Sequence, residues 1–410
     1  MTAICEPSTP AWVITRYLGF LCEDANPVVT LRNPVNLENW TLPVLEATII
    51  IGAILALIHA IRRWRDDGDP TNLALWLGAL VYLFIIEPPL YFPEWFGMQD
   101  AMGFMFAHNV FTVEFMYDRL PLYIICFYPA MSQVAYEIVR ALGFFDGTRY
   151  SALRGALVVA LVYQVFYEIF DQLGPQLRWW AWNVDEPFYD APAGVLGNPS
   201  AVPLLDAVPW SSVWLFATVS FAALTFFIVR WVKNPTERGQ EVRGWSLTWR
   251  ILAAGAIAVV SMPLLSITTA IFGRGPDANQ QAQTIVFAIQ VFAIWVIGGW
   301  LLLRQWRRQR AGAIPSGLPA QQAAPFLRVF PVLYLVVLAV LWAVALPAYF
   351  AATDGVTGAA AAPTGGTPIG NLAYVIACFI VAVTVLTAAL RQARRPRAAV
   401  AEPASDAVRA

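Results

Sequence analysis

The sequence predicts an all-α integral membrane protein, a bundle of about nine transmembrane helices with its N-terminus outside and its C-terminus in the cytoplasm. Composition is the first reason: 59% of the 410 residues are hydrophobic, 13% are charged and the mean hydropathy is +0.59, which is typical of a chain whose solvent is mostly lipid. The second reason is that apolar runs recur near the ~20 residues that cross a hydrocarbon core about 30 Å thick. Nine such segments follow one another, at residues 42–61, 72–90, 119–143, 151–173, 208–232, 248–272, 284–304, 327–350 and 370–390.

The third reason is the position of the basic residues. Of the 26 Lys and Arg residues, 21 fall on alternate connections and on the C-terminal tail. The opposite side keeps only Arg16, Arg32, Arg119, Arg178 and Arg274. The positive-inside rule then sets the orientation and predicts a multi-pass protein of the inner (plasma) membrane. Nucleic-acid binding is disfavoured because the basic residues are spread along membrane edges rather than gathered on one soluble module, and the sequence indicates no partner protein.

Residues 1–41 precede the first segment and are expected on the outer side. Within them, residues 11–22 are apolar but short, lack a basic flank and contain Arg16, so an interfacial helix is favoured over a cleavable signal. Cys5 and Cys22 fall on the same side, where a disulfide is chemically permitted. The sequence leaves open whether the two are bridged.

The two halves of the membrane region differ in content. Residues 42–232 hold nearly all the intramembrane polar groups and are expected to form the active-site half, whereas residues 233–390 are rich in Ala, Val and Leu and are expected to be a scaffold, followed by a cytoplasmic tail at 391–410. Residues 91–117 are too apolar and aromatic for a solvated loop and predict a re-entrant or interfacial element. Residues 178–190 place three Trp beside three carboxylates, which indicates either an aromatic belt in the headgroup zone or a lid whose rings line a site.

Ionisable side chains inside a membrane span are costly and are functional candidates. Gln164, Glu168 and Asp171 are spaced four and three residues apart in the fourth segment, so they share one helix face. This helix runs outward, and both its C-terminal dipole and an apolar setting disfavour an ionised carboxylate there. Glu87 repeats the arrangement at the outer end of the second segment, where a Pro-Pro pair is expected to end the helix. These three carboxyl groups are candidate proton donors, the alternative being wet carboxylates above the membrane edge.

Other ionisable residues have structural interpretations. Asp118, preceded by Glu114, comes just before the third helix and is interpreted as a cap for its free N–H groups. Glu137 and Arg140 lie three residues apart at the cytoplasmic end of that helix, and an ion pair explains both without catalysis.

The two histidines, His59 and His108, decide several questions about cofactors. Two are too few for a membrane di-iron enzyme, and their expected positions on opposite sides exclude a bis-His haem. No Cys/His cluster has zinc spacing. We therefore expect no cofactor and no metal. His108 and the adjacent Asn109 belong to the aromatic outer element, where they can either orient a water or substrate or simply form a satisfied interfacial pair.

Residues 80–215, about a third of the chain, contain a series of short motifs in a particular order. They are Leu83-Phe84-Ile85-Ile86-Glu87, Pro121-Leu122-Tyr123-Ile124, Tyr128-Pro129-Ala130-Met131 continuing to Tyr136, Tyr167-Glu168-Ile169-Phe170-Asp171, the pair Trp180 and Trp182, and the string Phe188, Tyr189, Pro192, Asn198 and Trp210. In order and rough spacing they resemble the carotenoid-biosynthesis membrane family whose members include bisanhydrobacterioruberin hydratase. The chain departs from that pattern at Gln172, where the family tends to have Pro, and at Asp190-Ala191, where it has Gly-Val. These departures put substrate and reaction in doubt more than the fold.

The resemblance implies addition of water to an isoprenoid end-group double bond. Such a reaction needs an acid to protonate the alkene, aromatic faces to stabilise the tertiary cation and a placed water. By this resemblance the expected catalytic acids are Glu87, Glu168 and Asp171. The expected substrate-binding residues are His108, Asn109, Tyr123, Gln164, Tyr167, Trp180, Trp182 and Asn183. The same machinery without water capture would give an isomerase or a cyclase.

Two other classes of function stay open, so the sequence does not decide whether the protein is an enzyme. A transporter would need polar groups strung across the bilayer, whereas the polar residues here collect toward the outer leaflet. A lipid-binding protein without catalysis would use the Trp-rich segment as its interface.

Overall fold

Eight helices in the described part of the chain are long and apolar enough to cross a membrane, which confirms the predicted all-α polytopic bundle. The computed structural model describes residues 10–96, 106–182, 203–260, 279–311, 325–353 and 368–392, with Cys5 and the stretches 267–268 and 271–273. The long single helices are α2 (Thr41–Asp67), α3 (Thr71–Tyr91), α6 (Leu122–Ala141), α7 (Ser151–Asp171), α13 (Gln280–Arg310), α14 (Pro325–Thr353) and α15 (Leu372–Gln392).

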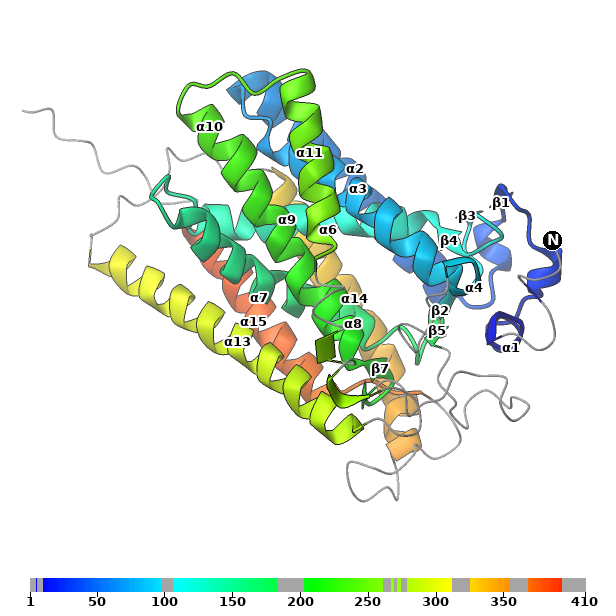
Figure 1. The fold of residues 1–410 in the computed structure, drawn as a ribbon. Coiled ribbons are helices and arrows are strands. Elements are labelled where there is room, and N and C mark those ends of the chain that lie inside the picture. The colour runs from blue at the N-terminus through cyan, green and yellow to red at the C-terminus, as the bar shows by residue number, and fades with distance from the viewer. Residues whose placement is uncertain are drawn as a thin grey trace, which may run out of the picture.

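The sixth predicted segment, 248–272, begins in α11 (Trp245–Ala258), and much of its remainder lies outside the described residues. Successive helices alternate in direction (Figure 1). The α2–α3 and α10–α11 connections therefore meet at the end of the bundle far from the N-terminus (Figure 1). This is the end at which the basic connections were predicted.

The fifth span is one continuous run of mixed helix between Trp210 and Glu237. It consists of α8 (Trp210–Trp214), a π-helical turn η5 (Leu215–Val219), α9 (Ser220–Ile228), a second π-helical turn η6 (Val229–Lys233) and α10 (Asn234–Glu237). π-Helical turns are rare and widen the backbone, so side chains after them are rotated relative to an α-helix.

Local side-chain hydrogen bonds set the ends of the first two spans. The Asn39 side chain accepts the backbone N–H of Thr41 at 3.0 Å where α2 begins, and Gly68 ends α2 with φ of +67°, a conformation that suits glycine. Asp69 Oδ1 then accepts the backbone N–H of Thr71 at 3.0 Å at the start of α3. A three-residue loop thereby reverses the chain, because both helix ends are satisfied locally.

The outer end of α3 differs from the prediction. Pro88 and Pro89 do not end the helix, which continues to Tyr91. Proline already has a helical φ, so its cost is the missing N–H and the local crowding, which a bundle tolerates. The backbone N–H of Phe92 still donates to the Pro88 carbonyl at 2.9 Å. As a result, Tyr91 lies one turn beyond Glu87 on the same helix face.

Short strands cover the outer end of the bundle, which the sequence analysis did not predict. β1 (Val29–Leu31), β3 (Val113–Phe115) and β4 (Leu120–Pro121) form one antiparallel sheet, and β2 (Phe106–His108) pairs with β5 (Trp180–Trp182) in another. β6 (Leu204–Leu205) and β7 (Val208–Pro209) make a small hairpin. The remaining short elements are α1 (Pro10–Tyr17), η2 (Cys22–Asp24), η3 (Pro34–Asn36) and α4 (Pro93–Phe96).

The N-terminal segment is tied to itself and to the outer sheets. Cys5 and Cys22 form a disulfide, which answers the question that the sequence left open. The interfacial helix expected over 11–22 is shorter in the structure, because α1 ends at Tyr17.

The burial of the spans separates a core from a lipid-facing shell. In α6 and α7, 83% of the most apolar window is buried inside the protein, against 22% in α13 and 33% in α15. The fully buried large side chains include Tyr82, Tyr123, Tyr136, Tyr163 and Trp179. Functional chemistry in the membrane region therefore has its protected space around α6 and α7.

Candidate functional site

A small cavity lies where α3, α6 and α7 meet the paired strands β2 and β5. Its volume is about 20 Å³, which is room for about one water molecule. The lining residues are Glu87, Tyr91, Phe106, His108, Ile124, Tyr128, Tyr167, Phe170, Asp171, Trp180, Trp182 and Phe216. The structure thus brings two carboxyl groups from different spans to one aromatic cavity.

Glu87 lies on α3 with 1% of its surface exposed. The hydroxyl of Tyr128, on α6, donates to its Oε1. Its Oε2 makes no hydrogen bond of standard geometry with the described residues, although the Tyr91 hydroxyl lies close enough to interact with the carboxyl group. One oxygen is thereby fixed in place while the other stays available to a molecule in the cavity.

Asp171 is the last residue of α7 and is 2% exposed. Ser212, on α8, donates its hydroxyl to Asp171 Oδ2 at 2.9 Å. Arg and Lys are absent from the residues that line the cavity, so neither Asp171 nor Glu87 has a cationic partner there. Carboxyl groups in such a dry, uncompensated position are unusual in proteins that use them only for stability.

Glu168 lies outside the cavity, although its carboxyl group is close enough to that of Asp171 for the two to interact electrostatically. It is fully buried, and Gln172, one turn further on, donates to its Oε2 at 3.0 Å. Its electrostatic neighbours include Tyr374 and Cys378 of α15, and it does not line the cavity. Of the three predicted acids, Glu87 and Asp171 therefore meet at the cavity, whereas Glu168 faces another side of α7.

His108 is held between two tyrosine hydroxyls. Its Nε2 lies 2.8 Å from the Tyr91 hydroxyl and its Nδ1 lies 2.8 Å from the Tyr123 hydroxyl. Burial lowers the pKa of His108 to about 3, so the ring is neutral at physiological pH. A neutral imidazole has one donor and one acceptor nitrogen, so one hydroxyl donates to the ring and the other accepts from it. The three side chains form a hydrogen-bonded chain that ends beside Glu87.

Paired strands position the tryptophans over this chain. Trp180 lies opposite His108 in the β2–β5 register, and Trp182 lies opposite Phe106. Both indoles are 3% exposed. A Cβ added at Gly174 would collide with the Trp180 ring, so only glycine at this turn allows the ring its place against α7. Phe170 completes the packing, with its ring centroid 4.8 Å from that of Trp180.

Four of the predicted binding residues lie elsewhere or play another part. The Gln164 amide donates to Thr218 Oγ1 at 2.6 Å and accepts from the Trp295 indole at 2.7 Å, so it joins three spans rather than lining the cavity. The side-chain amide of Asn109 donates to the backbone carbonyl of Arg178 at 2.7 Å and fixes the loop. Tyr123 reaches the cavity only through His108. Asn183 lies outside the described residues.

Several residues of the site were not predicted from the sequence, among them Tyr91 and Tyr128, which line the cavity, and Ser212, which binds Asp171. Tyr91 had a readable signal, because it follows Glu87 by four residues and so shares its face. Ser212 and Tyr128 had none, since each meets its carboxylate only through contacts between helices distant in sequence. Glu46 was also missed: this buried carboxylate of α2 accepts the backbone N–H groups of Thr112 and Val113 at 3.0 and 3.3 Å.

Asp118 has a different role from the predicted helix cap. The residue before α6 is Pro121, and no side chain caps that end. The Asp118 carboxylate instead accepts from Thr30 Oγ1 and from Arg32 Nη2, both at 2.5 Å. Arg32 also binds Glu114, with Nη1 2.6 Å from Oε2. Burial raises the pKa of Glu114 well above its usual range, although the Arg32 guanidinium opposes that shift.

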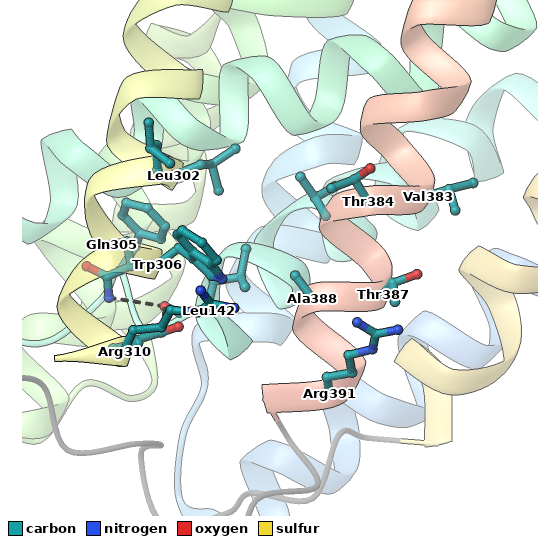
Figure 2. Close-up of a pocket in the computed structure, with 14 residues that line it drawn as sticks. Leu142, Leu302, Gln305, Trp306, Arg310, Val383, Thr384, Thr387, Ala388 and Arg391 are labelled. Carbon is teal, nitrogen blue, oxygen red and sulfur yellow. Dashed lines mark hydrogen bonds between the residues drawn. The ribbon is translucent and has the colours of Figure 1, made fainter. Parts of the chain in front are cut away.

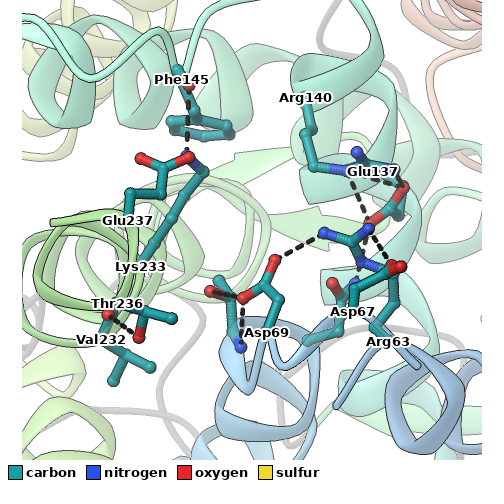
Figure 3. Close-up of polar contacts among 12 residues, drawn as sticks. Arg63, Asp67, Asp69, Glu137, Arg140, Phe145, Val232, Lys233, Thr236 and Glu237 are labelled. Atoms are coloured by element: carbon teal, nitrogen blue, oxygen red, sulfur yellow. Dashed lines mark hydrogen bonds and ion pairs between the residues drawn. The ribbon is translucent and has the colours of Figure 1, made fainter. Parts of the chain in front are cut away.

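The predicted ion pair between Glu137 and Arg140 is confirmed and belongs to a larger buried cluster at the end of the bundle that the basic connections predict to be cytoplasmic (Figure 3). Arg140 Nη2 lies 2.6 Å from Glu137 Oε2, and His59 Nε2 lies 3.2 Å from Oε1. Asn72, on α3, donates to the same Oε1 at 2.8 Å. Arg63, also drawn in Figure 3, pairs with two aspartates in the α2–α3 turn. The cluster ties together α2, α3 and α6.

No protein-family model matches this sequence, and neither curated proteins nor solved structures gave a match. The chemistry of the cavity therefore has to be inferred from its own side chains. These are two carboxyl groups, a tyrosine–histidine–tyrosine chain and a set of aromatic faces, enclosed at the outer end of the most buried helices.

Proposed function

We propose that this protein is a membrane enzyme that protonates a carbon–carbon double bond of an isoprenoid or carotenoid-like lipid, with Glu87 or Asp171 as the acid. The observation that carries the proposal is the presence of both carboxyl groups, from separate spans, on one aromatic cavity without a cation in its lining. A carboxyl group in such a setting suits proton donation better than charge pairing.

The geometry gives the acid a defined direction. Tyr128 occupies one oxygen of Glu87 and Ser212 occupies one oxygen of Asp171. In Glu87, the second oxygen makes no hydrogen bond of standard geometry with the described residues and can present its proton to an alkene. Protonation breaks the O–H bond, forms a C–H bond and leaves a tertiary carbocation opposite the new carboxylate.

The aromatic lining suits that carbocation. The faces of Trp180, Trp182 and Tyr167 line the cavity, and a cation over a desolvated ring gains about 2 kcal/mol. A water in the cavity then adds to the cation and returns a proton to the carboxylate, which restores the acid and completes a hydration. Return of a neighbouring C–H proton instead would give an isomer. In either case the second carboxyl group and the hydrogen-bonded chain through His108 offer routes for protons to and from Glu87.

The size of the cavity adds a requirement. At about 20 Å³ it holds a water but not a prenyl end group, so substrate binding must displace aromatic side chains from the space they fill. The rings of Phe106 and Trp182, with centroids 4.9 Å apart, close it on the strand side. We infer that these two rings separate when an end group enters.

A transporter is less well supported by the arrangement of polar groups. The sequence predicts that the polar side chains collect mainly toward the outer leaflet. The structure also places polar side chains at the end predicted to be cytoplasmic, around Glu137. Between Asn72 and Tyr82, however, the buried positions of α3 are apolar, including Leu75 and Ala79. The two polar regions are therefore separated along α3 rather than joined into a path.

The proposal is tested by producing the protein in cells that make acyclic polyenes and measuring products by mass spectrometry. Hydration predicts a product heavier by one water, and isomerisation a product of equal mass and different retention. Glu87→Gln or Asp171→Asn, whichever removes the acid, should lower product formation by about 10²–10⁴-fold, the usual contribution of a general acid. Glu168→Gln is the matched comparison, because this carboxyl group is as deeply buried on the same helix as Asp171 but does not line the cavity. Although it interacts electrostatically with Asp171, the activity of Glu168→Gln should fall far less than that of the variant that removes the acid.

Two results would contradict the proposal. One is conversion of polyene that persists in both Glu87→Gln and Asp171→Asn protein of normal abundance. The other is failure of the wild-type protein to convert or retain any polyene or prenyl lipid, while lipid extraction of the purified protein yields a small polar solute instead.

A further inference from the structure

A second, much larger cavity opens on the opposite side of the molecule, between the C-terminal halves of α13 and α15 (Figure 2). Its volume is about 790 Å³, within the range of ligand sites. The end of α6 forms its floor at Leu142, and the turn after it contributes Phe144. By the orientation that the basic connections predict, this groove lies in the cytoplasmic leaflet.

The walls of the groove are apolar in depth and basic at the mouth. Leu302 and Val385 lie in the deeper part, whereas Arg310 and Arg391 lie at the ends of the two helices. Figure 2 shows the two arginines on opposite walls, with Ala388 between them and the deeper apolar residues. The groove thus changes from apolar to charged in the same direction as one leaflet of a bilayer does, from acyl chain to headgroup.

The basic mouth is held in place by neighbouring side chains. The Arg310 guanidinium lies 4.0 Å from the ring centroid of Trp306, a cation–π contact that keeps the charge over the groove. Gln305 and Gln309 donate to the Leu142 carbonyl at 3.1 and 2.9 Å, which fixes α13 to the floor. The site is thus built before any ligand arrives.

We propose that this groove binds an anionic phospholipid, with one acyl chain between α13 and α15 and the phosphate between Arg310 and Arg391. Charge complementarity decides this choice of occupant, because basic pockets between transmembrane helices on the cytoplasmic side suit anionic headgroups. The surroundings agree: α13 is the least buried of the described spans, and Leu303 and Trp306, which line the groove, are 42% and 46% exposed, so the groove opens directly onto lipid.

Native mass spectrometry of the delipidated full-length protein, titrated with cardiolipin or with phosphatidylcholine, tests the proposal. The wild-type protein should bind cardiolipin in preference to phosphatidylcholine. The double variant Arg310→Gln/Arg391→Gln should bind cardiolipin about 30-fold more weakly, since each arginine near an anionic headgroup contributes close to fivefold. Ala388→Phe should also weaken binding, because it fills the space for the acyl chain without changing charge.

A second double variant, Arg62→Gln/Arg307→Gln, provides the control. It removes the same charge from two exposed arginines of the same end, one of them on α13, and neither lines the groove. It should change cardiolipin affinity by less than twofold. The proposal is overturned if the control weakens binding as much as Arg310→Gln/Arg391→Gln does, or if that variant and Ala388→Phe both bind cardiolipin like the wild type. It is equally overturned if the species lost in the variants is a protein dimer rather than a lipid adduct.

Discussion

Replacing Glu137 by Gln should destabilise the protein by about 3–5 kcal/mol, the usual cost of removing one partner of a buried ion pair. The cost arises because the Arg140 guanidinium stays buried when the Glu137 carboxylate is removed. Arg140 is 6% exposed, and its guanidinium directs both Nε and Nη2 at the Glu137 carboxylate, at distances of 2.6–3.1 Å. Gln can still accept from Asn72, so we expect a value near the lower end of that range.

The free energy of unfolding, measured by SDS titration in mixed micelles, checks this value. A double-mutant cycle with Arg140→Met separates the pair from the rest of the cluster. Glu137→Gln/Arg140→Met should be less destabilised than the sum of Glu137→Gln and Arg140→Met, by about 2 kcal/mol or more, because the double variant removes both charges of the pair. Additivity within about 0.5 kcal/mol, or a cost below about 1 kcal/mol for Glu137→Gln, would refute the reasoning.

Two further predictions concern the outer end. Gly174→Ala should push the Trp180 ring out of place, cost about 1–3 kcal/mol as overpacking does, and shift the tryptophan fluorescence; an unchanged spectrum and stability would contradict the packing described. Because burial raises the pKa of Glu114 above its ordinary 4.5, the folded state holds this proton more tightly than the unfolded state. Stability should therefore fall as pH rises above about 4.5, and Glu114→Gln, which resembles the protonated acid, should reduce that fall in a series of thermal melts; an equally steep decline in the variant would show that Glu114 is not its source.

The membrane bundle was predictable because each spanning helix is determined by its own stretch of sequence. In lipid, backbone polar groups must be satisfied within the segment, so every spanning helix appears as one continuous apolar run. The alternation of basic residues then checks the number of crossings. The outer strands offered no such signal. They are two or three residues long and pair across large sequence separations, as His108 does with Trp180, so periodicity cannot reveal them.

The candidate site was predictable only to the level of a helix face. At about 100° per residue, Gln164 and Asp171 point within about 20° of each other, and Glu168 points roughly 60° away from Asp171. Sequence spacing grouped all three. In the structure the first two face the fifth span, and Glu168 is turned toward α15. Whether Glu168 or Asp171 meets a cavity depends on the neighbouring helices, and the sequence of α7 does not contain that information.

The fifth span supplies the missing information, through hydroxyl groups next to its first π-helical turn. Thr218 Oγ1 donates to the Val213 carbonyl five residues earlier and accepts from Gln164 of α7. Ser220 Oγ likewise donates to a carbonyl five residues earlier, at 2.7 Å, and accepts from Tyr82 of α3 at 3.0 Å.

Each of these two hydroxyls thus donates its single proton to a carbonyl of its own span and offers a lone pair to another helix. Together with Ser212 on Asp171, they link the fifth span to α3 and α7, the two helices that carry the cavity's carboxyl groups. Three small polar residues thus help to fix the rotation of those helices, and with it the meeting of Glu87 and Asp171 at one cavity. In a hydropathy profile they are only brief interruptions of an apolar run.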